Sequence, residues 1–108
     1  MKLLLDENLP KGPKQDLGEH QIYTVREMGW LGFSNGKLLS LLVENEFDGF
    51  LTFDKQLQHQ QNFSKYKVAV LILIAVSNRY RYVKKLVPEI KSALSSPLKP
   101  GPLIIGAL

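Results

Sequence analysis

Short hydrophobic runs alternate with polar segments along the chain. Four of these runs lie at residues 2–5, 21–25, 49–53 and 67–75. They are too short for amphipathic helices and are rich in leucine, β-branched or aromatic residues, so they predict strands. The last run is apolar almost throughout, which is typical of a strand buried on both faces of a parallel sheet.

Helical spacing appears in the segments between these runs. Residues 13–17 predict a short helix that Pro13 can open. Ser34 or Asn35 is a good N-cap for a second helix, whose leucines form a broad apolar face and which ends near Glu46. One helical turn and a loop are expected within residues 56–62.

A long final helix is expected after the fourth strand. Ser77 and Asn78 are its predicted caps, and Pro88 predicts a kink inside it. After a break at residues 97–102, residues 103–105 can form a short last strand. Strands that alternate with helices predict one three-layer αβα domain over residues 1–108, with a mostly parallel sheet of about five strands.

Composition narrows the possible chemistry. The chain has no cysteine, which excludes disulfides, zinc–thiolate sites and thiol catalysis. Residues 1–54 hold five Lys and Arg against nine Asp and Glu, whereas residues 55–108 hold nine against one. A basic half attracts a polyanion, and an acidic cluster repels one unless a cation intervenes. The distribution suits a metal-dependent enzyme acting on a polyanion, although a solvated basic helix would give the same charge pattern.

Location is predicted from the apolar runs. The longest, residues 68–76, is far shorter than the roughly 20 residues that a membrane span needs. The first residues become charged too early for a signal peptide. We therefore expect a cytoplasmic protein with no membrane association.

The candidate chemistry lies at the ends of two predicted strands. Asp6 and Glu7 follow the first strand, and Asp54 follows the third. Parallel strands place their carboxyl ends at one edge of the sheet, where ligands bind, so these acids are expected to converge. Oxygen ligands without Cys or His suit Mg²⁺ or Mn²⁺. Asp6 and Asp54 are the predicted metal ligands and Glu7 is a further catalytic candidate; the alternative is that these acids cap the helices that follow.

Polar residues near these acids are candidates for substrate binding. Asn8 follows the acid pair and could hold a water molecule or the substrate, or serve only the turn. Lys55 follows Asp54 directly. The amide-rich tract at residues 58–62, which includes Gln60 and Asn62, could contact RNA or could be an exposed polar loop.

These motifs together resemble a known family, the PIN-like domains. The residues that carry the resemblance are the opening stretch 3–10 (LLLDENLP), the Met28-Gly29-Trp30 and Asn35-Gly36 segments, and Thr52-Phe53-Asp54-Lys55. Within the family they are similar to a small stand-alone bacterial group of toxins and predicted nucleases. The resemblance covers nearly the whole chain in matching order.

The resemblance implies a parallel sheet flanked by helices and Mg²⁺- or Mn²⁺-dependent cleavage of RNA. It also implies a toxin–antitoxin pair, with a small antitoxin as partner, and a possible homodimer. Asp6 and Asp54 match the family's acidic positions at the ends of the first and third strands.

One departure from the family pattern affects the predicted site. Related domains usually carry another acid near the start of the helix after the second strand, and here Lys37 stands about where that acid is expected. This departure makes a catalytically incomplete module that binds RNA or a partner an alternative to a metal-dependent endoribonuclease. A second alternative comes from the layout of the strand ends, where an acid pair ends the first strand, Asp54 ends the third, Ser77 follows the fourth and Lys99 comes later. That layout resembles a receiver-like phosphoacceptor domain, in which Asp54 would be the phosphorylated residue.

Overall fold

The computed structural model describes residues 1–60 and 66–106. Its centre is one sheet of five strands, all parallel to their neighbours, in the order β2-β1-β3-β4-β5. The predicted strands are confirmed, and β2, β3 and β4 are shorter than expected; the strands are β1 (Lys2–Leu5), β2 (Gln21–Thr24), β3 (Gly49–Thr52), β4 (Ala69–Leu73) and β5 (Gly101–Ile105). The sheet is thus wholly parallel, where a mostly parallel one was expected.

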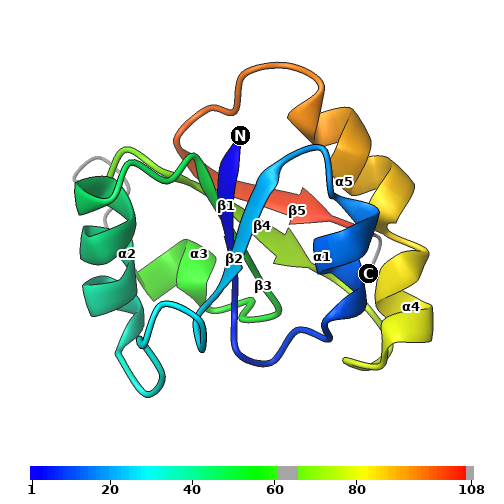
Figure 1. The fold of residues 1–108 in the computed structure, drawn as a ribbon, viewed down its shortest axis with the longest axis horizontal. Helices are drawn as coiled ribbons and strands as arrows, with labels where there is room; N and C mark the ends of the chain where they lie inside the picture. Colours follow the sequence, from blue (N-terminus) through cyan, green and yellow to red (C-terminus); the bar gives the residue numbers. More distant parts are fainter. Residues whose placement is uncertain (61–65, 107–108) are drawn as a thin grey trace.

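Helices cover both faces of the sheet and complete the three-layer α/β fold (Figure 1). On one face, Leu3 and Leu5 of β1 belong to the core formed with α1 (Gly12–Asp16), α4 (Tyr80–Lys84) and α5 (Val87–Leu94). On the other face, Leu4 packs in the core formed with α2 (Asn35–Glu44) and α3 (Leu57–Gln60). Successive side chains of a strand point to opposite faces, so the leucine run of β1 supplies both cores.

The start of α2 is set by its cap. Of the two predicted caps, Ser34 is the one used, and its Oγ accepts a hydrogen bond from the backbone N–H of Lys37 at 3.2 Å. Leu38, Leu39 and Leu42 are buried against the sheet. This cap places Asn35 in the first turn of α2, beside the carboxyl ends of the strands.

The prediction of one continuous final helix was wrong, although a disruption was correctly expected at Pro88. The chain forms α4 and α5 instead, and Pro88 lies in the first turn of α5. Proline has no N–H to donate, and its ring would clash with the carbonyl four residues earlier, that of Lys84, where α4 ends. A new helix started around Pro88 avoids both conflicts.

The predicted caps of this segment are also wrong. The residue that precedes α4 is Arg79, and no side chain caps the helix. Ser77 accepts a hydrogen bond from the N–H of Arg79 at 3.3 Å, so it orders the turn before α4.

The last strand is longer than predicted. β5 begins at Gly101, which adopts a positive φ of 111° that glycine tolerates. Pro102 lies inside it, which is acceptable because β5 is an edge strand. No helix in residues 1–60 or 66–106 is long and apolar enough to cross a membrane.

Candidate metal site at the carboxyl edge of the sheet

A cavity of about 380 Å³ lies at the carboxyl edge of the sheet, at the ends of β1 and β3. The chain leaves β1 for β2 on one side and later enters β3 on the other, so the strand order reverses between them. In open parallel sheets, ligands bind at such a reversal. The cavity is lined by Asp6, Glu7 and Asn8 after β1, by Phe53 and Asp54 after β3, and by Phe33, Asn35 and Leu38 around the start of α2.

Thr52 connects the two aspartates. Its side chain is fully buried, and its Oγ1 donates a hydrogen bond to Asp6 Oδ2 at 2.6 Å. The same oxygen accepts from the backbone N–H of Asp54 at 3.1 Å. One hydroxyl group therefore fixes both the Asp6 carboxylate and the backbone that carries the Asp54 carboxylate.

Asn35 holds the second carboxylate from the helix side. Its Nδ2 donates a hydrogen bond to Asp54 Oδ2 at 3.0 Å, and this bond links α2 to the end of β3. The residue of α2 that reaches the acids is thus Asn35, whereas Lys37 is exposed and its Nζ lies 6.0 Å from the centre of the Phe33 ring. The first turn of α2, where the resemblance led us to expect an acid, therefore presents an amide to Asp54.

The remaining contacts of the carboxylates come from backbone groups. Asp6 Oδ1 accepts from the N–H of Glu7 at 2.8 Å, and Asp54 Oδ1 accepts from the N–H of Gln56 at 3.0 Å. Each carboxylate oxygen carries two lone pairs, and among the described residues each accepts from one donor, which leaves capacity for a cation. Neither aspartate forms a salt bridge within the part of the chain that the structure describes.

The cavity offers few protein ligands for a divalent metal ion. Among the described residues, no three Asp, Glu or His side chains are grouped so that they could hold a metal. Mg²⁺, however, is commonly bound through one or two carboxylates, with water and substrate phosphates completing its coordination. The pair Asp6 and Asp54 fits that mode, in which the protein supplies only part of the coordination.

The other predicted site residues lie around this cavity or beyond it. Glu7 and Asn8 are exposed at the cavity wall. Lys55 is exposed and lines a neighbouring groove instead. Gln60 is the last residue of α3, and its side chain, like the whole of Asn62, lies outside the described residues.

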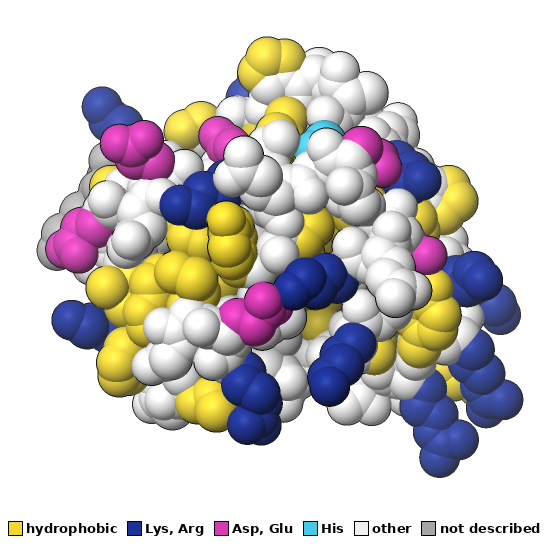
Figure 2. Space-filling view, viewed as in Figure 1, with side chains coloured by type: hydrophobic (Ala, Val, Ile, Leu, Met, Phe, Trp, Pro, Cys, Tyr) yellow, Lys and Arg dark blue, Asp and Glu magenta, His cyan; other side chains and the backbone are white. Residues whose placement is uncertain are grey.

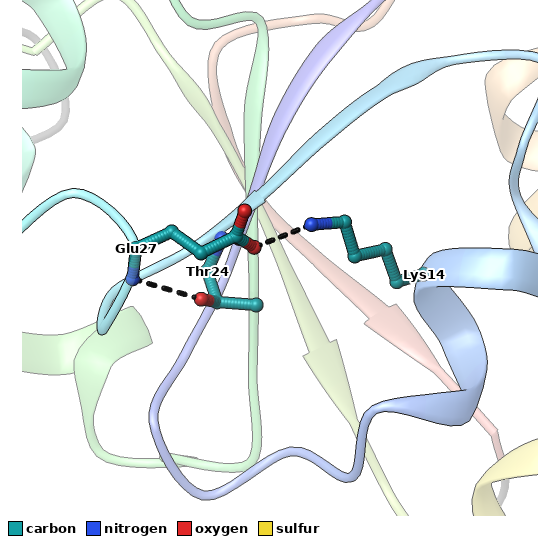
Figure 3. Close-up of polar contacts among 3 residues, drawn as sticks. All are labelled: Lys14, Thr24 and Glu27. Carbon is teal, nitrogen blue, oxygen red and sulfur yellow. Dashed lines mark hydrogen bonds and ion pairs between the residues drawn. The ribbon is translucent and has the colours of Figure 1, made fainter.

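A polar cluster fixes the loop after β2, next to this edge (Figure 3). Glu27 accepts a hydrogen bond from Lys14 Nζ at 2.6 Å, and this contact is the main cause of the lowered pKa of its carboxyl group. The N–H of Glu27 donates to Thr24 Oγ1 at 3.1 Å, and the N–H of Thr24 donates back to Glu27 Oε1. The cluster joins α1 to the end of β2, which borders a smaller cavity shared with Asp6.

Lys99, which the receiver-like alternative would require near Asp54, lies elsewhere in this fold. Lys99 precedes β5, which begins at Gly101. Because all five strands are parallel, Lys99 lies at the edge opposite Asp54. Ser77 follows β4 at the same edge as Asp54, and its Oγ contacts the N–H of Arg79.

Two residues that hydrogen-bond to the aspartates of this cavity, Thr52 and Asn35, received no role in the site from the sequence. A threonine that ends a wholly apolar strand, two positions before an acid, was the available signal for Thr52. Asn35 was considered only as a candidate cap of the helix that follows β2.

Comparison of the chain with family models, curated proteins and solved structures finds no match in any of the three.

Proposed function

We propose that this chain is a Mg²⁺- or Mn²⁺-dependent endoribonuclease of the PIN-like class. The observation that supports it is the shared cavity of Asp6 and Asp54 at the strand-order reversal, with Thr52 tying the two together. The burial and hydrogen bonding of Thr52 hold two carboxylates at one site, and neither carboxylate forms a salt bridge with a basic residue among residues 1–60 and 66–106. Such an arrangement is unfavourable unless a cation is bound, because like charges repel.

The roles of the side chains follow from their contacts. Asp6 and Asp54 would hold the ion, which when bound lowers the pKa of water and stabilises the charge that develops on a phosphodiester. Thr52 and Asn35 are positioning residues that fix the two carboxylates. Glu7, exposed at the cavity wall, is a further catalytic candidate.

A protein partner is part of the proposal, with the chain as the cytoplasmic toxin of a toxin–antitoxin pair. Leu31 and Phe33 are each 41% exposed, and both border cavities that the acids also line. An antitoxin that buried these side chains would cover the acid cavity and block access to it. A second copy of the chain could use the same apolar surface to form a homodimer.

Metal removal tests the proposed activity directly. We expect the purified protein to cleave single-stranded RNA in the presence of Mg²⁺ or Mn²⁺, to stop in excess EDTA, and to resume when Mn²⁺ is restored. Gel analysis of a labelled oligonucleotide measures this. Cleavage that continues at the same rate in EDTA would contradict metal dependence.

A second candidate function is a PIN-like module that binds RNA or a partner without turnover. The specific observation that favours it is the amide of Asn35 at the position facing Asp54, where a third carboxylate would strengthen metal binding. The two candidates differ in whether the pair of aspartates alone binds metal tightly enough for catalysis.

Asn35→Asp addresses this point. Without metal the variant loses a hydrogen bond to Asp54 and gains a like charge beside it, so we expect a stability loss of about 1–2 kcal/mol. With Mn²⁺ it should bind about tenfold more tightly than the wild type, since carboxylates are the preferred ligands of such ions. Melting temperatures with and without Mn²⁺ measure both effects.

The control for this variant is Gln21→Glu, which adds one negative charge on an exposed residue at the opposite edge of the sheet. It should not change the Mn²⁺-induced rise in melting temperature. An Asn35→Asp protein that folds yet shows no larger rise than the wild type would argue against a metal site at this cavity.

A further inference from the structure

A second groove begins one residue beyond the acid cavity. It has a volume of about 420 Å³ and is lined by Lys55, by residues 74–76 after β4, and by Tyr82, Lys85 and Leu86 from α4 and the turn that follows. Lys55 directly follows Asp54, which lines the acid cavity. The groove therefore runs from the candidate metal site towards α4 along the same edge of the sheet.

The α4 side of this groove is strongly basic. Arg79, Arg81, Lys84 and Lys85 are all exposed, and Figure 2 shows Lys and Arg side chains gathered over α4 at the lower right. None of these four forms a salt bridge with any residue in the described ranges. Such a group of cations attracts a polyanion.

The nearest acid in the sequence does not neutralise this surface. Glu89 is the single acidic residue after Asp54. Its carboxylate accepts hydrogen bonds from the backbone N–H of Gly106, at 3.2 and 3.1 Å for its two oxygens. Asp16 also contacts α4, where it accepts a hydrogen bond from the Tyr80 hydroxyl, but within the described ranges neither acid forms a salt bridge with the basic residues of α4. These cations therefore remain available to a ligand.

An aromatic ring lies among these cations. Tyr82 is half-buried, with the Arg81 guanidinium 4.8 Å and the Lys85 ammonium 5.7 Å from its ring centre. Val76 lines the same groove and is 84% exposed, so packing within the chain does not explain its apolar character. An aromatic ring beside cations, in a groove that also exposes apolar surface, is an arrangement on which unpaired bases stack while phosphates are neutralised.

We propose that this groove binds a single strand of nucleic acid, with a base against Tyr82 and Val76 and phosphates at Lys55 and Lys85. A base within a duplex is already stacked and paired, so it could not enter the groove. The inference extends the proposed function, because a strand held there would lead past Lys55 into the acid cavity. Binding itself requires neither metal nor cleavage.

Fluorescence anisotropy with a labelled single-stranded oligonucleotide in EDTA tests the groove apart from catalysis. Tyr82→Leu should weaken binding about tenfold, whereas Tyr82→Phe, which retains the ring, should bind as the wild type does. The double variant Lys55→Gln/Lys85→Gln should weaken binding and reduce the slope of log affinity against log salt by about 1.4, since each lost phosphate contact contributes about 0.7.

The matched control is Lys67→Gln/Lys99→Gln, which removes two exposed cations at the opposite edge of the sheet. Equal weakening by this control, or equal affinity for a duplex of the same sequence, would overturn the proposal. RNA and DNA probes are compared, and groove-dependent binding of either single strand supports it.

Two results separate this inference from the proposed function. Groove-dependent binding by a protein that never cleaves RNA with Mn²⁺ would refute the nuclease and keep the groove. The rate of metal-dependent cleavage is also measured at sub-saturating RNA. If Tyr82→Leu and the double lysine variant both cleave as fast as the wild type, the groove is refuted and the nuclease is kept.

Discussion

Asp54→Asn is expected to reduce metal-dependent RNA cleavage by about 10³-fold. The substitution preserves the volume of the side chain, and its remaining oxygen can still accept from Asn35 or Gln56, but it removes one of the two charges at the cavity. A divalent ion loses several kcal/mol of stabilisation, and each 1.36 kcal/mol corresponds to a factor of ten in rate. Initial rates on a labelled oligonucleotide at saturating Mn²⁺ measure the loss. Asp6→Asn should behave in the same way.

The folded state should survive this change. Neutralising one of two neighbouring carboxylates relieves repulsion but gives up one of the two hydrogen bonds that Asp54 accepts. The two effects oppose each other, so the melting temperature without metal should stay within a few degrees of that of the wild type. Glu44→Gln is the matched control, because it neutralises an exposed acid at the far end of α2 and should keep full activity. Asp54→Asn and Asp6→Asn proteins that both retained cleavage within tenfold of wild type would rule out a role for these carboxylates in the reaction.

The layers of the fold were predictable because the strands are buried on both faces. The leucines of β1 and the continuous apolar run of β4 leave little choice but a parallel sheet covered by helices. The final helix was mispredicted because Val83, Val87 and Ile90 keep one apolar spacing across α4 and α5. Side-chain periodicity does not report the backbone conflict at Pro88, which decided where α4 ends.

The candidate site was predictable only in part, for a different reason. Asp6 and Asp54 could be placed at one edge because each follows an apolar strand, and strand direction then fixes their location. The contacts of Thr52 and Asn35 join residues that lie far apart in the sequence. No local pattern specifies which side chain of α2 will face β3. The pairing depends on how the capped helix docks on the sheet.

Thr52→Val is the second change with a large expected effect. Valine fills nearly the same volume in this fully buried position, but it neither donates to Asp6 nor accepts from the N–H of Asp54. Losing a bond to a charged group and leaving a backbone donor without its partner should cost about 2 kcal/mol of stability. For a domain of this size, that corresponds to a melting temperature lower by about 10 °C. Thermal unfolding followed by circular dichroism measures it.

Metal affinity distinguishes a positioning role of Thr52 from a merely structural one. Without the hydroxyl, both carboxylates are less well fixed, so Thr52→Val should bind Mn²⁺ about tenfold more weakly, and Thr52→Ser, which restores the hydroxyl, should recover most of that affinity. Thr24→Val removes a hydroxyl at the end of β2 that contacts the N–H of Glu27, and it should leave Mn²⁺ affinity unchanged. If Thr52→Val bound Mn²⁺ as tightly as wild type, the hydroxyl of Thr52 would serve the packing of β3 alone, and the two aspartates would be oriented by backbone and Asn35 contacts.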